Sequence, residues 1–308
     1  MAVDTFEQIA GQYDPAIATG VNAVIGNAIA GNATTIADAL TLYVLIIGAL
    51  LAFREMTYPR FVTHALRAAC IAFLMTAAGF NQMIATPAMD TIPAWIAQAT
   101  NAQTGVTSAP QQFDLIWSAT KHLEAAIIQQ ATGWENIGYQ IVARWDTILA
   151  GFLLAVCFVI YEFSRGIMGL LVATLPFVLS LYLFEATRGI PLRVAQKGVG
   201  VLILQLLLSI TLQLMLRGDA YFLMTAAQNG AGDLDAQLAA YANLLVFFFF
   251  GTGLVIFIPS IATYIGGGIA LSLGGTVMRT AVRAAPIAGN AVAAAGRAGG
   301  RLISRARS

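Results

Sequence analysis

Few side chains in this sequence have the types and spacing that covalent or metal chemistry requires. His64 and His122 are the only histidines among the 308 residues, and the charge pattern described below places them near opposite sides of a membrane. A zinc site built on histidines from one chain is therefore not expected. Cys70 and Cys157 both lie in apolar runs, which favours buried thiols over a disulfide. No phosphate-binding loop of the G-x-x-x-x-G-K-S/T kind occurs. From the sequence we therefore expect no catalytic residue, no cofactor and no metal site. We predict that the protein is not an enzyme.

The clearest polar pattern lies inside an apolar run. Gln205, Ser209 and Gln213 recur at intervals of four residues within VLILQLLLSITLQLML, so they share one face of a helix. Polar groups in hydrocarbon are costly, and they turn toward a partner helix or a wet cavity. Two interpretations stay open: hydrogen bonds between packed helices, or one wall of a passage.

All four tryptophans fall between residues 95 and 145. An indole prefers the headgroup layer of a bilayer, so these side chains are candidate membrane anchors, and Trp145, which abuts an apolar run, is the clearest of them. Tryptophan is also enriched at the centres of protein interfaces. Trp117, Trp134 and Trp145 are therefore also candidate residues for docking a partner.

The C-terminal segment from residue 279 carries basic side chains and no acidic ones. Each basic side chain near an anionic membrane contributes about 1 kcal/mol of attraction. The irregular spacing and the lack of aromatic residues disfavour a specific reader of nucleic acid. The candidate contacts to lipid or to a cytoplasmic partner are Arg279, Arg283, Arg297, Arg301, Arg305 and Arg307.

The composition indicates the class of protein, because 58% of the residues are hydrophobic and only 10% are charged. Soluble domains carry about a quarter charged residues, so an all-α polytopic membrane protein is predicted. A membrane crossing needs roughly 20 helical residues. The predicted spans are 36–53, 68–84, a helix beginning near Thr147, 198–216 and 244–265.

The apolar stretch 147–184 determines how many times the chain crosses. Glu162 and Arg165 interrupt it one helical turn apart and are expected to pair at a membrane edge. We predict that the chain reaches the cytoplasm near Arg165. Residues 167–184 are then expected to form a re-entrant helical hairpin bent near Pro176, where a helix loses a hydrogen bond. Six complete spans are the alternative.

The basic residues favour five crossings, with the N-terminus in the periplasm and the C-terminus in the cytoplasm of a bacterial inner-membrane protein. In that arrangement 13 of the 16 Lys and Arg residues lie in the cytoplasm, against 11 for six spans. The predicted division is a periplasmic segment 1–35, two spans and a cytoplasmic loop at 36–86, a periplasmic helical loop at 87–146, a membrane bundle at 147–278 and a basic cytoplasmic tail at 279–308.

The loop at 87–146 is predicted to contain two helices. Apolar residues at helical spacing indicate an amphipathic helix from Gln111 to Thr132, ended by Gly133. Thr91 before Pro93 indicates the start of a shorter helix.

This layout resembles the TrbL family, the polytopic inner-membrane subunits of VirB-type type IV secretion systems, which move DNA or proteins out of bacteria. The most family-like passages are GWENIGYQIVARWDTILAGF at residues 133–152 and the Gly/Ala/Arg-rich tail. The resemblance implies a non-enzymatic subunit of a secretion or conjugation apparatus that helps to form the translocation conduit and the base for pilus assembly. The implied partners are membrane lipid, pilins, a periplasmic scaffold, a cytoplasmic ATPase, translocated DNA or protein, and further copies in a homo-oligomer.

A self-contained membrane transporter or channel for a small solute is the strongest rival. Such proteins often show inverted repeats and interrupted helices around a charged site at the membrane midplane. No repeat is evident in this sequence, and no charge lies securely at a midplane. An intramembrane enzyme is a more distant alternative, because no constellation of nucleophile, base and metal ligands is found.

Overall fold

The computed structural model describes residues 5–55, 57–100, 108–228 and 234–266. Within these ranges all regular elements are helices. The longer ones are α1 (Thr5–Ala52), α2 (Tyr58–Leu74), α4 (Ile92–Thr100), α5 (Ala109–Gln130), α6 (Ile137–Leu179), α7 (Gly189–Gln228) and α8 (Leu234–Gly266). The short ones are α3 (Ala77–Phe80), the π-helical turns η1 (Asn81–Ala85) and η2 (Pro87–Thr91), and the 3-10 turns η3 (Trp134–Asn136) and η4 (Ser180–Leu183).

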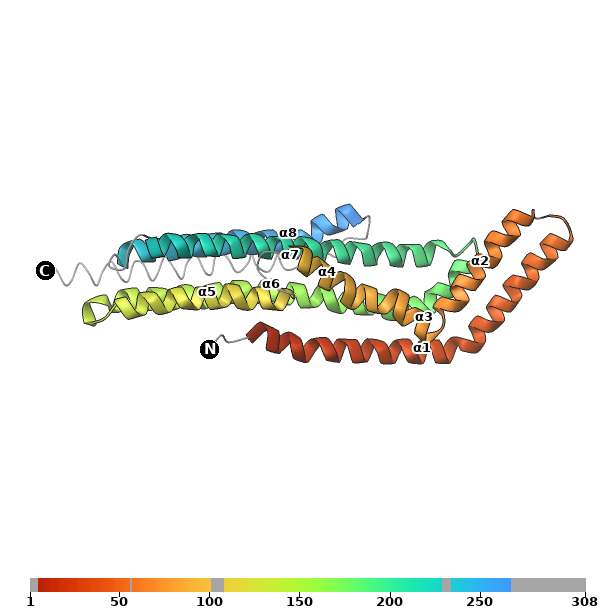
Figure 1. Ribbon diagram of the computed structural model, residues 1–308, viewed down its shortest axis with the longest axis horizontal. Coiled ribbons are helices and arrows are strands. Elements are labelled where there is room, and N and C mark those ends of the chain that lie inside the picture. The colour runs from red at the N-terminus through yellow and green to blue at the C-terminus, as the bar shows by residue number, and fades with distance from the viewer. Residues whose placement is uncertain (1–4, 56, 101–107, 229–233, 267–308) are drawn as a thin grey trace, which may run out of the picture.

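The helices form an elongated bundle. Figure 1 shows α5, α6, α7 and α8 lying along its long axis, with the first part of α1 beside them. The far end of α1 and helix α2 form an antiparallel arm at one end. α6 has 43 residues and is therefore about 64 Å long at 1.5 Å per residue. Because hydrocarbon is about 30 Å thick, α6 must extend beyond the apolar layer.

Four helices are long and apolar enough to cross a membrane, or five if one bent pair counts as a single span. The bent pair joins Tyr58–Leu74 to Ala77–Thr100 at an angle of 90°. The predicted all-α polytopic class is thereby confirmed. The four unbroken candidates are Ala33–Ala52, Ile137–Leu183, Gly189–Tyr221 and Gln237–Ile265.

The predicted re-entrant hairpin at residues 167–184 is wrong, and the second crossing that six spans would need here is not seen either. α6 continues through Arg165 and Gly166 and includes Pro176 without a break. A proline removes one intrahelical hydrogen bond, and Pro176 is buried among neighbours that keep the helix in place. Arg165 pairs sideways with Asp14 of α1, so the charged interruption need not reach the membrane edge.

The break in the membrane helices lies instead inside the predicted second span, 68–84. The Thr76 hydroxyl donates to the Phe73 carbonyl at 2.7 Å and accepts from the Gly79 N–H at 3.0 Å, which caps the start of α3. A Cβ on Gly79 would lie 2.2 Å from the Phe73 carbonyl oxygen, so this turn requires glycine. The two π-helical turns follow directly, and such turns often occur at functional sites.

Both helices predicted in the loop at 87–146 are confirmed. α5 (Ala109–Gln130) begins after Ser108, whose hydroxyl accepts a hydrogen bond from the Gln111 N–H at 3.4 Å. Gly133, which follows α5, has a φ of 94°, a conformation that favours glycine. The shorter predicted helix is α4, which follows η2.

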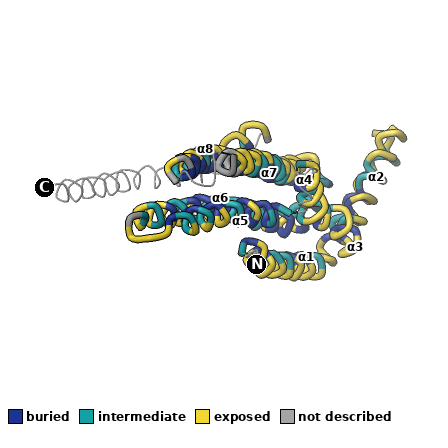
Figure 2. The backbone as a smooth tube through the Cα atoms, turned by 60° about the vertical axis from the view of Figure 1, so that its left-hand side comes forward, coloured by how far each residue is buried: buried dark blue, intermediate teal, exposed yellow. Residues whose placement is uncertain are grey.

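The N-terminal residues are part of the bundle. Residues 5–35 continue without a break into the first span as one helix, α1. At its start the ring of Phe6 packs against Phe113 of α5 and Phe158 of α6, with centroids 5.6 and 5.1 Å away. Figure 2 shows buried residues where the bundle helices meet and mostly exposed residues on the outer side of α1. This packing fixes α1 against α6 beside the pockets described next.

Candidate functional site

Three pockets follow the face of α7 that carries the polar residues. The first has a volume of about 320 Å³ and lies between α1, η2, α6 and α7. The second, of about 280 Å³, lies beside α4 and shares Met89, Asp90, Arg165 and Gln205 with the first. The third, of about 240 Å³, lies beside Gln213. The first two pockets are therefore adjacent, and the row continues along α7.

The three predicted residues of α7 are distributed along this row. Gln205 lines the first and second pockets, Ser209 the second and Gln213 the third. The hydroxyls of Ser209 and Thr100 share a hydrogen bond of 2.6 Å that links α7 to α4. Gln205 is 4% exposed, and its Oε1, like that of Gln213, has no hydrogen-bond partner among the described residues. Ser209 therefore joins two helices, whereas Gln205 and Gln213 carry side-chain carbonyl oxygens without a hydrogen-bond partner among the described residues.

An ion pair that the sequence analysis missed closes one side of the first pocket. Arg165 of α6 binds Asp14 of α1, which is 151 residues away in the chain. The expected pairing of Arg165 with Glu162 is not formed as a hydrogen bond, because both Glu162 carboxylate oxygens are unpartnered within the described residues. Burial raises the pKa of Asp14, and the Arg165 guanidinium opposes that shift. Sequence spacing gives no signal for a contact between residues so far apart.

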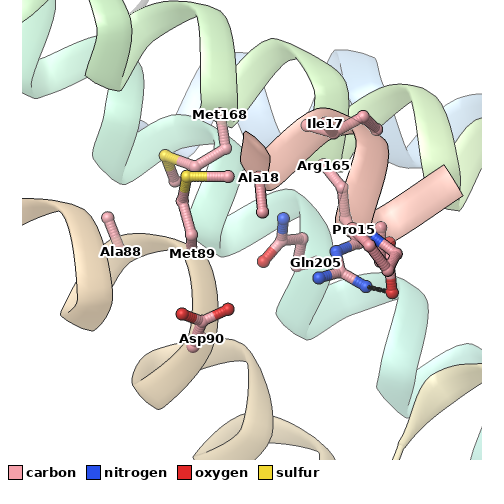
Figure 3. Close-up of a pocket in the computed structure, with 10 residues that line it drawn as sticks. Pro15, Ile17, Ala18, Ala88, Met89, Asp90, Arg165, Met168 and Gln205 are labelled. Carbon is pink, nitrogen blue, oxygen red and sulfur yellow. Dashed lines mark hydrogen bonds and ion pairs between the residues drawn. The ribbon is translucent and has the colours of Figure 1, made fainter. Parts of the chain in front are cut away.

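Figure 3 shows how the polar groups of the first pocket are arranged. The Gln205 amide lies between Asp90 on one side and Arg165 on the other. Met89 and Met168 supply apolar wall. The lining therefore contains one more acidic than basic side chain, with Asp14 and Asp90 against Arg165.

The candidate docking tryptophans differ in exposure. Trp134 is 89% exposed and Trp145 is 66% exposed. Trp117 is partly buried in the main core, and a Cβ on Gly151 of α6 would lie 3.0 Å from its ring. The Lys121 amine lies 5.1 Å from the centroid of that ring. Trp117 thus contacts this chain's own α6 across a close helix approach, whereas Trp134 and Trp145 face outward.

The predicted contacts of the basic tail, Arg279 to Arg307, lie outside the described residues. Over the part of the chain that the structure describes, no group of three or more His, Cys, Asp or Glu side chains is placed to hold a metal ion.

Comparison with known proteins gives the family. The profile of the family described as TrbL/VirB6 plasmid conjugal transfer protein matches residues 40–258, which include the three α7 residues, Asp90 and Arg165. The chain belongs to the TrbL/VirB6 family. It is 24% identical over 261 residues to Protein VirB6 of Rhizobium radiobacter, and the alignment covers 83% of this chain and 87% of that protein. Protein VirB6 of Agrobacterium fabrum and of Agrobacterium tumefaciens strain 15955 match with the same identity and coverage.

Membership of the TrbL/VirB6 family makes this chain a membrane subunit of type IV secretion or conjugation machinery, as its layout predicted. The prediction of a self-contained solute transporter is correspondingly disfavoured. The matched region contains the predicted docking tryptophans and the residues that line the second and third pockets. Asp14, which completes the ion pair at the first pocket, precedes it.

Proposed function

We propose that this chain is a non-enzymatic inner-membrane subunit that helps to form the substrate conduit and the base for pilus assembly in a type IV secretion or conjugation apparatus. The observation that carries the proposal is the polar face of α7, on which Gln205, Ser209 and Gln213 line successive pockets. Polar groups inside an apolar helix are costly unless they face a partner helix or water. In a conduit subunit such a row supplies a hydrated wall.

The sizes of the pockets support a conduit that several copies share. The largest of the three, about 320 Å³, is at the lower end of the range for small-molecule sites. A polypeptide or a DNA strand needs a wider passage, so further copies or other subunits must complete it. The span in α1 is available for such contacts or for lipid, because only 17% of its most apolar window is buried.

The proposed sidedness places the N-terminus in the periplasm and the basic tail in the cytoplasm. With a periplasmic N-terminus, a complete crossing by the bent pair Tyr58–Leu74 and Ala77–Thr100 gives five crossings and a cytoplasmic C-terminus. A re-entrant bent pair would give four crossings and a periplasmic tail. The six arginines of the tail favour the first arrangement, because basic segments stay in the cytoplasm.

The proposed partners follow from exposure and charge. Trp134 and Trp145 present large aromatic surfaces at the loop end of the bundle, which suits contacts with pilins or a periplasmic scaffold. The basic tail suits anionic lipid or a cytoplasmic ATPase.

Photo-crosslinking during transfer tests the conduit. A photoreactive residue at Gln213 faces the third pocket, and one at Val246, a 67% exposed position on α8, is the matched control. We expect the transferred DNA or protein to be recovered crosslinked to the Gln213 variant and not to the Val246 variant. Crosslinks to lipid alone from both positions in a transfer-competent strain would contradict a conduit along α7.

A further inference from the structure

The first pocket brings three oxygen acceptors together from three different helical segments. Asp14 belongs to α1, Asp90 to η2 and Gln205 to α7, and all three line the same pocket. One Asp14 oxygen binds Arg165, whereas its Oδ1 is buried without a hydrogen-bond partner among the described residues. The Oε1 of Gln205 is also buried without a hydrogen-bond partner among the described residues, and Gln205 is 4% exposed. A buried carbonyl without a donor costs free energy, so the pocket is suited to a ligand that donates hydrogen bonds.

The charge of the site selects a cation. Its lining contains two acidic side chains, Asp14 and Asp90, and one basic side chain, Arg165. An anion such as a phosphate headgroup would meet this excess of negative charge. Opposite charges attract, so a positively charged ligand is favoured.

The shape and donor pattern narrow the class of cation. The pocket volume of about 320 Å³ greatly exceeds that of a bare metal ion, and Met89 and Met168 supply flexible apolar walls for an alkyl chain. None of the described residues that line it is aromatic, whereas quaternary ammonium groups are recognised by aromatic cages. An alkylammonium group has three N–H donors and no acceptor, which suits a lining whose polar acceptors are carboxylate and amide oxygens.

We propose that this pocket binds a primary ammonium group on an alkyl stem, as the lysine side chain of a partner polypeptide presents it. The ammonium group donates to Asp90 and to Gln205 Oε1, and the stem lies along the two methionines. Asp14 contributes negative charge to the same lining, and Arg165 acts as a positioning residue because it binds Asp14. Asp90 is exposed, so the pocket is open for a side chain to enter.

The direct test measures thermal unfolding of the full chain in nanodiscs of phosphatidylglycerol and phosphatidylcholine. n-Butylammonium chloride is compared with tetramethylammonium chloride at equal ionic strength. We expect butylammonium to raise the Tm saturably and tetramethylammonium, which has the charge but no N–H donor, to have no such effect. Equal shifts with the two salts would overturn the proposal, because charge alone would then explain them.

Two variants test whether the rise in Tm with butylammonium comes from binding in this pocket. Gln205→Met keeps the length of the side chain but removes its oxygen, and Asp90→Asn removes the charge at an exposed position. Loss of a hydrogen bond to a charged ligand should weaken the apparent affinity for butylammonium about tenfold or more. Gln213→Met, on the same face of α7 but outside this pocket, is the control and should bind as the wild type does. Unchanged affinity in a folded Gln205→Met or Asp90→Asn variant would overturn the site.

Two further comparisons identify the source of the ammonium group. Nα-acetyl-lysine methylamide should raise the Tm, whereas the same compound acetylated on Nε, which has lost its charge, should not. The butylammonium response should also persist in nanodiscs that contain phosphatidylethanolamine. Loss of the response only in those discs would show that the lipid headgroup occupies the pocket and would overturn the assignment to lysine. A negative result in any of these binding experiments leaves the proposed conduit function intact, because none of them measures the transfer of DNA or protein.

Discussion

The carboxylate of Asp114 in α5 accepts a hydrogen bond of 2.9 Å from the backbone N–H of Phe6, 108 residues away in the chain. Its second oxygen accepts from the N–H of Glu7 at 2.8 Å. The first turn of a helix leaves its N–H groups without intrahelical partners, and its dipole favours a negative charge there. Asp114 therefore caps α1 from another helix and ties the N-terminus to the bundle.

Removal of this cap should loosen α1. We expect Asp114→Ala to lower the free energy of unfolding by about 1–2 kcal/mol, because one buried and one partly buried N–H group lose their acceptor. Thermal unfolding in detergent measures the loss, and Asp38→Ala, at an exposed position of α1, is the control. An Asp114→Ala variant as stable as the control would show that the cap contributes little.

The break between α2 and α3 should depend on Gly79. Gly79→Ala places a Cβ 2.2 Å from the Phe73 carbonyl oxygen, which is backbone and cannot move aside cheaply. We expect a loss of about 1–3 kcal/mol in unfolding free energy. Gly48→Ala in α1, where a Cβ meets nothing within 4 Å, should be neutral or stabilising. The measurement is the unfolding midpoint of each variant. Equal midpoints for Gly79→Ala and Gly48→Ala would contradict the tight turn.

Sidedness is predicted from the distribution of basic residues. Single cysteines at Ser108 and Ser308, introduced after replacement of Cys70 and Cys157, should react with a membrane-impermeant maleimide from opposite faces. Ser108 should label in intact spheroplasts and Ser308 only after the membrane is opened. Labelling of both residues from the same side would exclude five crossings.

Substitutions of the tryptophans should distinguish residues that dock a partner from a residue that packs inside the chain. Trp134→Asp combined with Trp145→Asp should leave the protein inserted but reduce its co-purification with other secretion subunits, because both rings face outward. Trp117→Ala should instead lower the Tm, because its ring packs against Gly151. Normal assembly of the double Asp variant would rule out docking through these rings.

The basic tail should act through charge. Replacement of Arg297, Arg301, Arg305 and Arg307 by lysine should preserve cargo transfer, whereas replacement by alanine should reduce it, because lipid attraction needs charge and not the planar guanidinium. Transfer is compared at matched abundance in the membrane. An inactive all-lysine variant would instead indicate bidentate binding of carboxylates or phosphates.

Local patterns in the sequence predicted the elements whose stability depends on their own residues. Composition gave the polytopic membrane class, and apolar periodicity gave α5 within two residues at each end. The spacing of Gln205, Ser209 and Gln213 placed them on one face because an α-helix repeats about every four residues. The hairpin near Pro176 failed because helical propensity at a proline is a local property, whereas the bundle around α6 kept that helix continuous.

The sequence by itself therefore determined that the chain is a set of membrane helices and which face of α7 is polar. Only the tertiary structure decided that Asp14 pairs with Arg165, that Asp114 caps α1, and that Gln205 meets Asp90 in one pocket. The physical reason is distance along the chain. Hydrophobic periodicity acts over a few turns of helix, whereas an ion pair across 151 residues depends on which helices become neighbours.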